Sequence, residues 1–187
     1  MSSSPDLHDL IQNIDEQLAQ ASDGSEAISS LLETKQEEMI RYILVGIGAL
    51  HLAISIDNLA EVGPLPPLTS LPNLPSWIQG IVNIRSEVVS VIDFGGFLHL
   101  EKGTTCNGGR LAVLRYKKRK VGLRLDRIIG TVHRGASEQT PLDNVEDGTV
   151  DTSLFGSGLR IEKNFFYILN VRRFLTAPRL IDYNRVG

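Results

Sequence analysis

Residue types that commonly carry catalysis or bind metals are few in this chain of 187 residues, and their spacing does not assemble a site. The chain has four histidines at scattered positions, without the spacing of metal ligands: His8, His51, His99 and His133. Cys106 is the only cysteine, which excludes an internal disulfide and a cysteine metal site, and no close base would stabilise its thiolate. We therefore expect neither a metal nor a cofactor.

Two acids, Asp93 and Asp126, each end an apolar run of the kind that forms a strand. A carboxylate pair could act in general acid–base chemistry, but aspartate at the end of a strand commonly accepts backbone hydrogen bonds in turns. The chain has no phosphate-binding loop, nucleophile elbow or dinucleotide-binding glycine pattern. We expect a protein that is not an enzyme, and the competing hypothesis is a ligand-binding or enzymatic β-barrel with one of these acids in a pocket.

The stretch from Arg110 to Arg134 has nine basic residues and one acidic residue. Such a stretch could bind the phosphates of a nucleic acid, yet Tyr116 is the only aromatic residue in it on which a base could stack. Alternation would place Arg115, Lys117 and Arg119 together on one solvated strand face. We expect no nucleic-acid partner and keep a nucleic-acid-binding module as an alternative.

The net charge of −3 hides an asymmetry along the chain. Residues 1–40 hold nine acids and one base, a charge of −8, and the remainder holds 13 acids and 18 bases, a charge of +5. Residues 1–39 are predicted to be an acidic helical extension, whose role could be solubility or docking. Its first helix would carry one apolar stripe, made of Leu7, Leu10, Ile11, Ile14 and Leu18. No apolar run approaches the roughly 18 residues that span a bilayer, so we expect no membrane insertion and a cytoplasmic location.

From residue 40 the pattern changes to that of short β-strands. We expect a hairpin over 40–54, a helical or turn connection over 55–62 and a stiff proline-rich loop over 63–77. Strands are then predicted at 80–85 and 87–93, followed by a short helix at 94–99. After a loop at 101–109, a second set of strands is predicted at 110–116, 120–126 and 127–134. A polar loop at 135–153 leads to a last hairpin over 154–170 with its turn at about 162–164, and then come a helix at 170–176 and a tail at 177–187. This pattern indicates a mainly β protein built from small barrels.

The most informative segment is the pair of predicted strands over residues 80–93. It contains Gly80, Ile81, Val82, Asn83, Ile84 and Arg85, then Val88, Val91 and Asp93. In a strand, Asn83 and Arg85 would share one face, while Val82 and Ile84 would face the core. Arg85 could pair with Glu61 or Glu87. An exposed pair would stabilise by only about 0.2–1 kcal/mol, whereas breaking a buried pair would cost roughly 3–5 kcal/mol.

These residues resemble the CheW family, whose signature has the form G-[IV]-[IV]-N-[ILV]-R-G followed by a short V-rich strand that ends in Asp. Ser86 stands where the final glycine is usual, which restricts the backbone at that turn. The resemblance covers residues 40–176. It implies two intertwined, five-stranded, SH3-like β-barrel subdomains, with the first and last segments crossing between them.

The resemblance also implies a function. Members of the family are non-enzymatic adaptors that couple methyl-accepting chemoreceptors to a CheA-type histidine kinase, in arrays at the inner face of the membrane. A groove between the subdomains would receive the cytoplasmic tip of the receptor. The protein-binding residues carried over by position, with their neighbours on the motif, are Leu59, Glu61, Val62, Gly80, Asn83, Arg85, Ser86 and Gly122.

Overall fold

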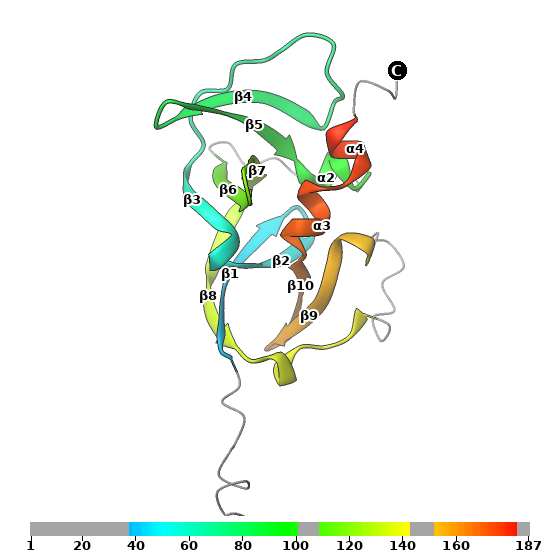
Figure 1. Ribbon diagram of the computed structural model, residues 1–187. Coiled ribbons are helices and arrows are strands. Elements are labelled where there is room, and N and C mark those ends of the chain that lie inside the picture. Colours follow the sequence, from blue (N-terminus) through cyan, green and yellow to red (C-terminus); the bar gives the residue numbers. More distant parts are fainter. Residues whose placement is uncertain (1–37, 101–108, 143–151, 183–187) are drawn as a thin grey trace, which may run out of the picture. The chain divides into compact units, whose positions relative to one another are not determined.

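The computed structural model describes residues 38–100, 109–142 and 152–182 (Figure 1). The predicted acidic helices and Cys106 lie outside these residues, so the expected boundaries of the extension and of the tail stay predictions. No helix within the described ranges is both long enough and apolar enough to cross a membrane.

The fold is mainly β, as expected, and consists of two five-stranded sheets with several short helices between strands. The first sheet has the order β8-β1-β2-β10-β9, with β1 at Ile40–Ile47, β2 at Leu50–Ser55, β8 at Arg127–Arg134, β9 at Phe155–Ile161 and β10 at Asn164–Leu169. The second has the order β3-β6-β7-β5-β4, with β3 at Leu59–Pro64, β4 at Ile78–Ile84, β5 at Glu87–Asp93, β6 at Arg110–Tyr116 and β7 at Arg119–Leu125. The helical elements are η1 (Ile56–Asn58), α2 (Phe94–Phe97), η2 (Ala136–Glu138), η4 (Thr152–Leu154), α3 (Val171–Leu175) and α4 (Pro178–Ile181).

The two sheets repeat one pairing pattern, which the sequence did not reveal. In each sheet an edge strand pairs antiparallel with a hairpin, β8 with β1–β2 and β3 with β6–β7. The second strand of that hairpin pairs parallel with the second strand of another hairpin, β2 with β10 and β7 with β5. A short helix then follows β5 and β10 alike.

The sheets do not divide the chain at the loop over 101–109, where the sequence pattern placed a break between two β sets. Strands β6 and β7 complete the sheet of β3–β5, and β8–β10 return to β1 and β2. The first and last strands therefore share one sheet, which is the intertwined arrangement that the family resemblance implied.

Each sheet curls until its two edges meet. The chain that leaves edge strand β3 reaches the opposite edge at β4, where Thr69 and Ile81 exchange two backbone hydrogen bonds of 2.9 Å. In the same way the chain that leaves β8 reaches β9, where Thr140 and Gly158 exchange two bonds of 2.8 Å. These two bridges close the sheets and are consistent with the expected small barrels.

Several strands contain unbroken runs of apolar residues, because both of their faces are buried. In β1, Leu44 belongs to a cluster within the first sheet, while its neighbour Val45 belongs to the cluster that both sheets share. In β6, Leu111 lies in a cluster within the second sheet, while its neighbour Ala112 lies in the shared cluster. The shared core thus fixes the two sheets against each other.

One prediction of secondary structure was partly wrong. Residues 55–62 were expected to be a helical or turn connection, and the structure has the short helix η1 followed by the strand β3. The register of β3 against β6 shifts between Leu59 and Glu61, so Ala60 is an extra residue of a bulge. This bulge breaks the alternation of polar and apolar residues by which a strand is recognised.

Candidate functional site

Arg85 lies in the turn between β4 and β5, not in the strand. Residues Arg85 and Ser86 are the two central residues of a hairpin turn and have φ angles of 49° and 68°. Two positive φ angles are what a type I′ turn requires, because its twist matches that of the flanking strands. The prediction that Asn83 and Arg85 share a strand face was therefore wrong, since the strand ends at Ile84.

The Arg85 side chain turns toward the opposite edge of the sheet. Its Nε atom lies 3.1 Å from Oε2 of Glu61 in β3. Glu87, the other expected partner, pairs instead with Lys120. The Arg85 side chain is 83% exposed and that of Glu61 is 36% exposed. The pair is therefore an exposed ion pair, which stabilises the fold by only about 0.2–1 kcal/mol.

The strand before this turn has the expected division between core and surface. Val82 is buried, and Ile84 packs against the cluster within the second sheet. Asn83 is exposed and lies opposite Val88 of β5, a residue that is 68% exposed. The β4–β5 hairpin therefore carries an exposed polar side chain, one member of an ion pair and an exposed valine.

Leu59 and Val62 lie on the same edge strand as Glu61 and are half-buried. Both pack against the core that the two sheets share, which places them near the junction of the sheets. The bulge at Ala60 is the reason that Leu59 and Val62 can both face this core although they are three positions apart. This edge strand therefore presents two half-buried apolar residues beside an exposed ion pair.

The two glycines of the expected site are buried and have structural roles. Gly80 has a φ of 143°, and a Cβ atom there would lie 2.4 Å from the carbonyl oxygen of Thr69. A Cβ at Gly122 would lie 2.8 Å from Cδ1 of Leu111. Gly80 admits the closing bridge at Thr69, and Gly122 makes room inside the sheet, so neither offers a side chain or an open surface to a partner.

Asp93 and Asp126, which were considered as a catalytic pair, each accept a hydrogen bond from a backbone N–H group. Asp93 caps α2 by accepting a hydrogen bond of 3.1 Å from the backbone N–H of Gly96. Asp126 accepts one of 2.5 Å from the backbone N–H of Gly48. Asn170 caps α3 as Asp93 caps α2, at the equivalent place in the other sheet.

Two histidines of the described ranges, His51 and His133, each lie within hydrogen-bond distance of an arginine. Nε2 of His51 lies 2.9 Å from an Arg127 nitrogen, and Nε2 of His133 accepts a bond of 2.9 Å from Nε of Arg41. Burial, and secondarily the charge of Arg127, lower the pKa of His51. No cluster of His, Cys, Asp and Glu that could hold a metal occurs among the residues that the structure describes.

The basic stretch does not form the single strand face that was expected. The turn of its hairpin is at Lys117 and Lys118, so Arg115 in β6 and Arg119 in β7 belong to different strands. Arg119 donates to the carbonyl oxygen of Leu175 at 2.9 Å. The basic side chains are thus spread over both strands of a hairpin, and some of them are hydrogen-bonded within the protein. This arrangement does not favour nucleic-acid binding.

Comparison with known proteins identifies the family. Residues 41–179 match the CheW-like domain. The chain belongs to the CheW-like domain family. The resemblance of residues 80–93 to CheW is thereby confirmed, and with it the expected role of an adaptor in chemosensory signalling.

Two curated relatives and one solved structure illustrate the match. The chemotaxis protein CheW of Treponema pallidum is 26% identical over 148 residues, 77% of this chain and 86% of that protein. Protein PilI of Pseudomonas aeruginosa is 27% identical over 115 residues, 59% of this chain and 65% of that protein. The crystal structure of the scaffolding protein TtCheW from Thermoanaerobacter tengcongensis has a TM-score of 0.63 at 19% identity, covering 71% of this chain and 89% of that one. The similarity spans both sheets of the CheW-like domain.

Proposed function

We propose that this protein is a non-enzymatic adaptor that joins the cytoplasmic tip of a methyl-accepting chemoreceptor to a CheA-type histidine kinase. Membership of the CheW-like family carries this proposal, because the family match spans both sheets. The complex would assemble on the cytoplasmic face of the membrane, where receptor tips and kinase form arrays.

We place receptor binding on the Glu61–Arg85 surface, defined as Leu59, Glu61, Val62, Asn83, Arg85 and Ser86. A receptor tip is a helical hairpin, and a helix in a groove needs apolar contacts flanked by polar groups that fix its orientation. Leu59 and Val62 are half-buried apolar residues, and Arg85 and Asn83 are exposed polar ones. Gly80 and Gly122 would act indirectly, by shaping the sheet beneath this surface.

The ion pair would set the orientation of the docked helix more than the total affinity. An exposed ion pair contributes little to folding, so its two charges remain available to polar groups of a partner. Single contacts of this kind are weak, and an array strengthens them because each adaptor is held at several points at once.

The test is capture of the protein by immobilised receptor fragments, compared between Arg85→Glu and Lys163→Glu. Both changes replace a base by an acid in a hairpin turn, and Lys163 lies in the equivalent turn of the first sheet, between β9 and β10. Arg85→Glu places two carboxylates together on the proposed surface and should abolish capture, while Lys163→Glu should retain it. Equal capture of both variants would refute the proposed surface.

The double variant Glu61→Arg, Arg85→Glu separates two roles of the pair. It restores the attraction between the two side chains with reversed charges. If Arg85 only positions the turn, this variant should recover capture. If Arg85 contacts the receptor directly, as proposed here, the double variant should stay deficient although it folds normally.

A further inference from the structure

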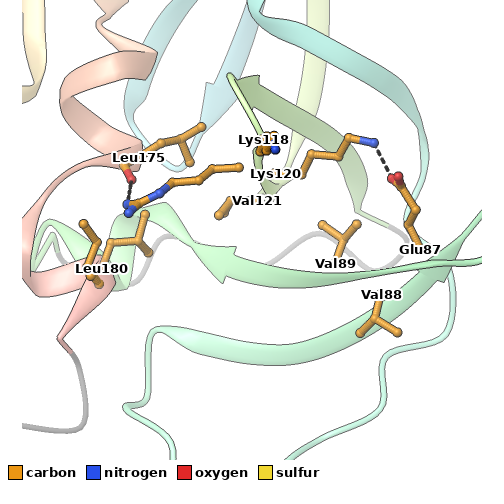
Figure 2. A pocket seen from close by; sticks show the side chains of 10 residues that line it. Glu87, Val88, Val89, Lys118, Lys120, Val121, Leu175 and Leu180 are labelled. Atoms are coloured by element: carbon orange, nitrogen blue, oxygen red, sulfur yellow. Dashed lines mark hydrogen bonds and ion pairs between the residues drawn. The ribbon is translucent and has the colours of Figure 1, made fainter.

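An open groove lies beside the C-terminal helices, and its lining includes neither Leu59 nor Val62. Figure 2 shows the side chains that line it. Its walls come from the beginning of β5, the beginning of β7, the end of α3, and α4. The lining residues are Glu87, Val88, Val89, Lys118, Arg119, Lys120, Val121, Leu175, Leu180 and Ile181. We call this the C-terminal groove.

The C-terminal groove has an exposed apolar residue on each of two walls, above a buried apolar base. Val88 is 68% exposed and Ile181 is 44% exposed, whereas Val89, Val121 and Leu175 form a buried base. Figure 2 shows Val88 and Val89 on one side and Leu175 and Leu180 on the other. An apolar strip with open sides suits the apolar face of a helix.

Positive charge dominates the rim of the groove. Lys120 pairs with Glu87, which is the only acid of the lining. Arg119 donates to a backbone carbonyl, that of Leu175, so no carboxylate neutralises its charge. Lys118 is exposed and has no ion pair with an acid of the described residues. Two of the three cations thus lack a counter-charge, which favours an acidic occupant.

The wall formed by α3 and α4 is held in place from both ends. Arg119 binds the end of α3 through the bond to Leu175. Arg179 of α4 donates to the carbonyl oxygen of Phe97 at 2.6 Å, and its guanidinium lies 4.9 Å from the centre of the Phe97 ring and 5.7 Å from that of Trp77. The groove is therefore largely formed before any partner arrives, which reduces the entropy lost on binding.

We propose that the C-terminal groove binds an acidic amphipathic helix of a partner protein. The apolar face of such a helix would cover Val88 and Ile181, and its carboxylates would meet Lys118 and Arg119. A nucleic acid would use the cations but leave the apolar strip uncovered, and a purely apolar segment would leave the cations without partners. This inference goes beyond the proposed adaptor function, since it concerns a second kind of partner and a groove that shares only the β4–β5 hairpin with the Glu61–Arg85 surface.

The test uses a fluorescein-labelled designed peptide of about 18 residues, with leucines along one helical face and glutamates on the other. A control peptide carries lysine at every glutamate. Fluorescence anisotropy with the full chain should show saturable binding of the acidic peptide and no binding of the lysine control. The affinity for the acidic peptide should fall as the salt concentration rises. Equal binding of both peptides, stronger binding of the basic peptide, or no binding of the acidic peptide up to about 1 mM would overturn the proposal.

Two variants locate the binding. Lys118→Glu and Val88→Asp should each raise the Kd of the acidic peptide by roughly tenfold, because they remove a rim charge and an apolar contact. The matched controls are Lys163→Glu, in a turn of the first sheet, and Leu71→Asp, at an exposed leucine of the proline-rich loop. All four positions are exposed, and circular dichroism verifies folding. An unchanged Kd in both groove variants would overturn the proposal, as would an equal loss in the controls.

Discussion

The ion pair of Arg85 and Glu61 joins the two edges of the second sheet. Glu61 lies in the edge strand β3, and Arg85 follows the opposite edge strand β4, yet Nε and Oε2 are 3.1 Å apart. They can meet because the sheet curls and is closed by the bridge between Thr69 and Ile81. The seam of a closed sheet is thus also the surface that we propose for receptor binding.

Arg85→Ala should leave the fold almost as stable as before. The side chain is 83% exposed, so its removal should lower the free energy of unfolding by no more than about 1 kcal/mol. Urea unfolding followed by circular dichroism measures this value. A loss above roughly 3 kcal/mol would mean that the pair is a buried structural contact after all.

Ser86→Gly should stabilise the protein. Ser86 has a φ of 68°, a conformation that costs an L-residue more than it costs glycine. Part of the gain is offset by the larger entropy of glycine in the unfolded chain, so we expect a net increase of about 0.5–1 kcal/mol in the free energy of unfolding. A thermal melt that shows a lower Tm for the variant would contradict the left-handed turn.

Gly80→Ala should be strongly destabilising, and Gly63→Ala provides its control. An added Cβ would collide with the Thr69 carbonyl at residue 80 but meet nothing within 4 Å at residue 63. We expect a loss of roughly 2–4 kcal/mol for Gly80→Ala and a change within about 0.5 kcal/mol for Gly63→Ala. Similar unfolding midpoints for the two variants would rule out the close approach of Thr69.

His51 should make stability depend on pH below neutrality. Its pKa is lowered by burial and by Arg127, so the folded protein binds a proton less readily than the unfolded chain does. As the pH falls below about 6.5, the unfolded state gains protons first and stability is lost. His51→Gln should reduce this slope in melts recorded from pH 7 to pH 5. An unchanged slope, or an NMR titration with a raised pKa, would contradict the assignment.

The sequence predicted most strands because their apolar runs are long and lie between clear turns. It did not predict β3, since the bulge at Ala60 disrupts the alternation that identifies a strand. It also did not predict the repeated pairing pattern. One sheet takes its strands from both ends of the chain, so the repeat has no fixed period that a sequence would display.

The candidate site was predicted in its composition but not in its geometry. The segment around Asn83 and Arg85 could be found from the sequence alone, and the pairing with Glu61 was one of two possibilities. The placement of Arg85 in the turn could not be foreseen, because arginine and serine rarely adopt positive φ angles. Nor could the C-terminal groove, since Val88, Lys118 and Ile181 are brought together only by the fold.

Co-sedimentation tests the central claim, that this protein recruits a kinase to receptors. A CheA-type kinase is mixed with vesicles that carry receptor cytoplasmic fragments, with the protein absent, present, or replaced by Arg85→Glu. The kinase should sediment with the vesicles only when the unaltered protein is present. Equal sedimentation of the kinase in all three mixtures would contradict this claim.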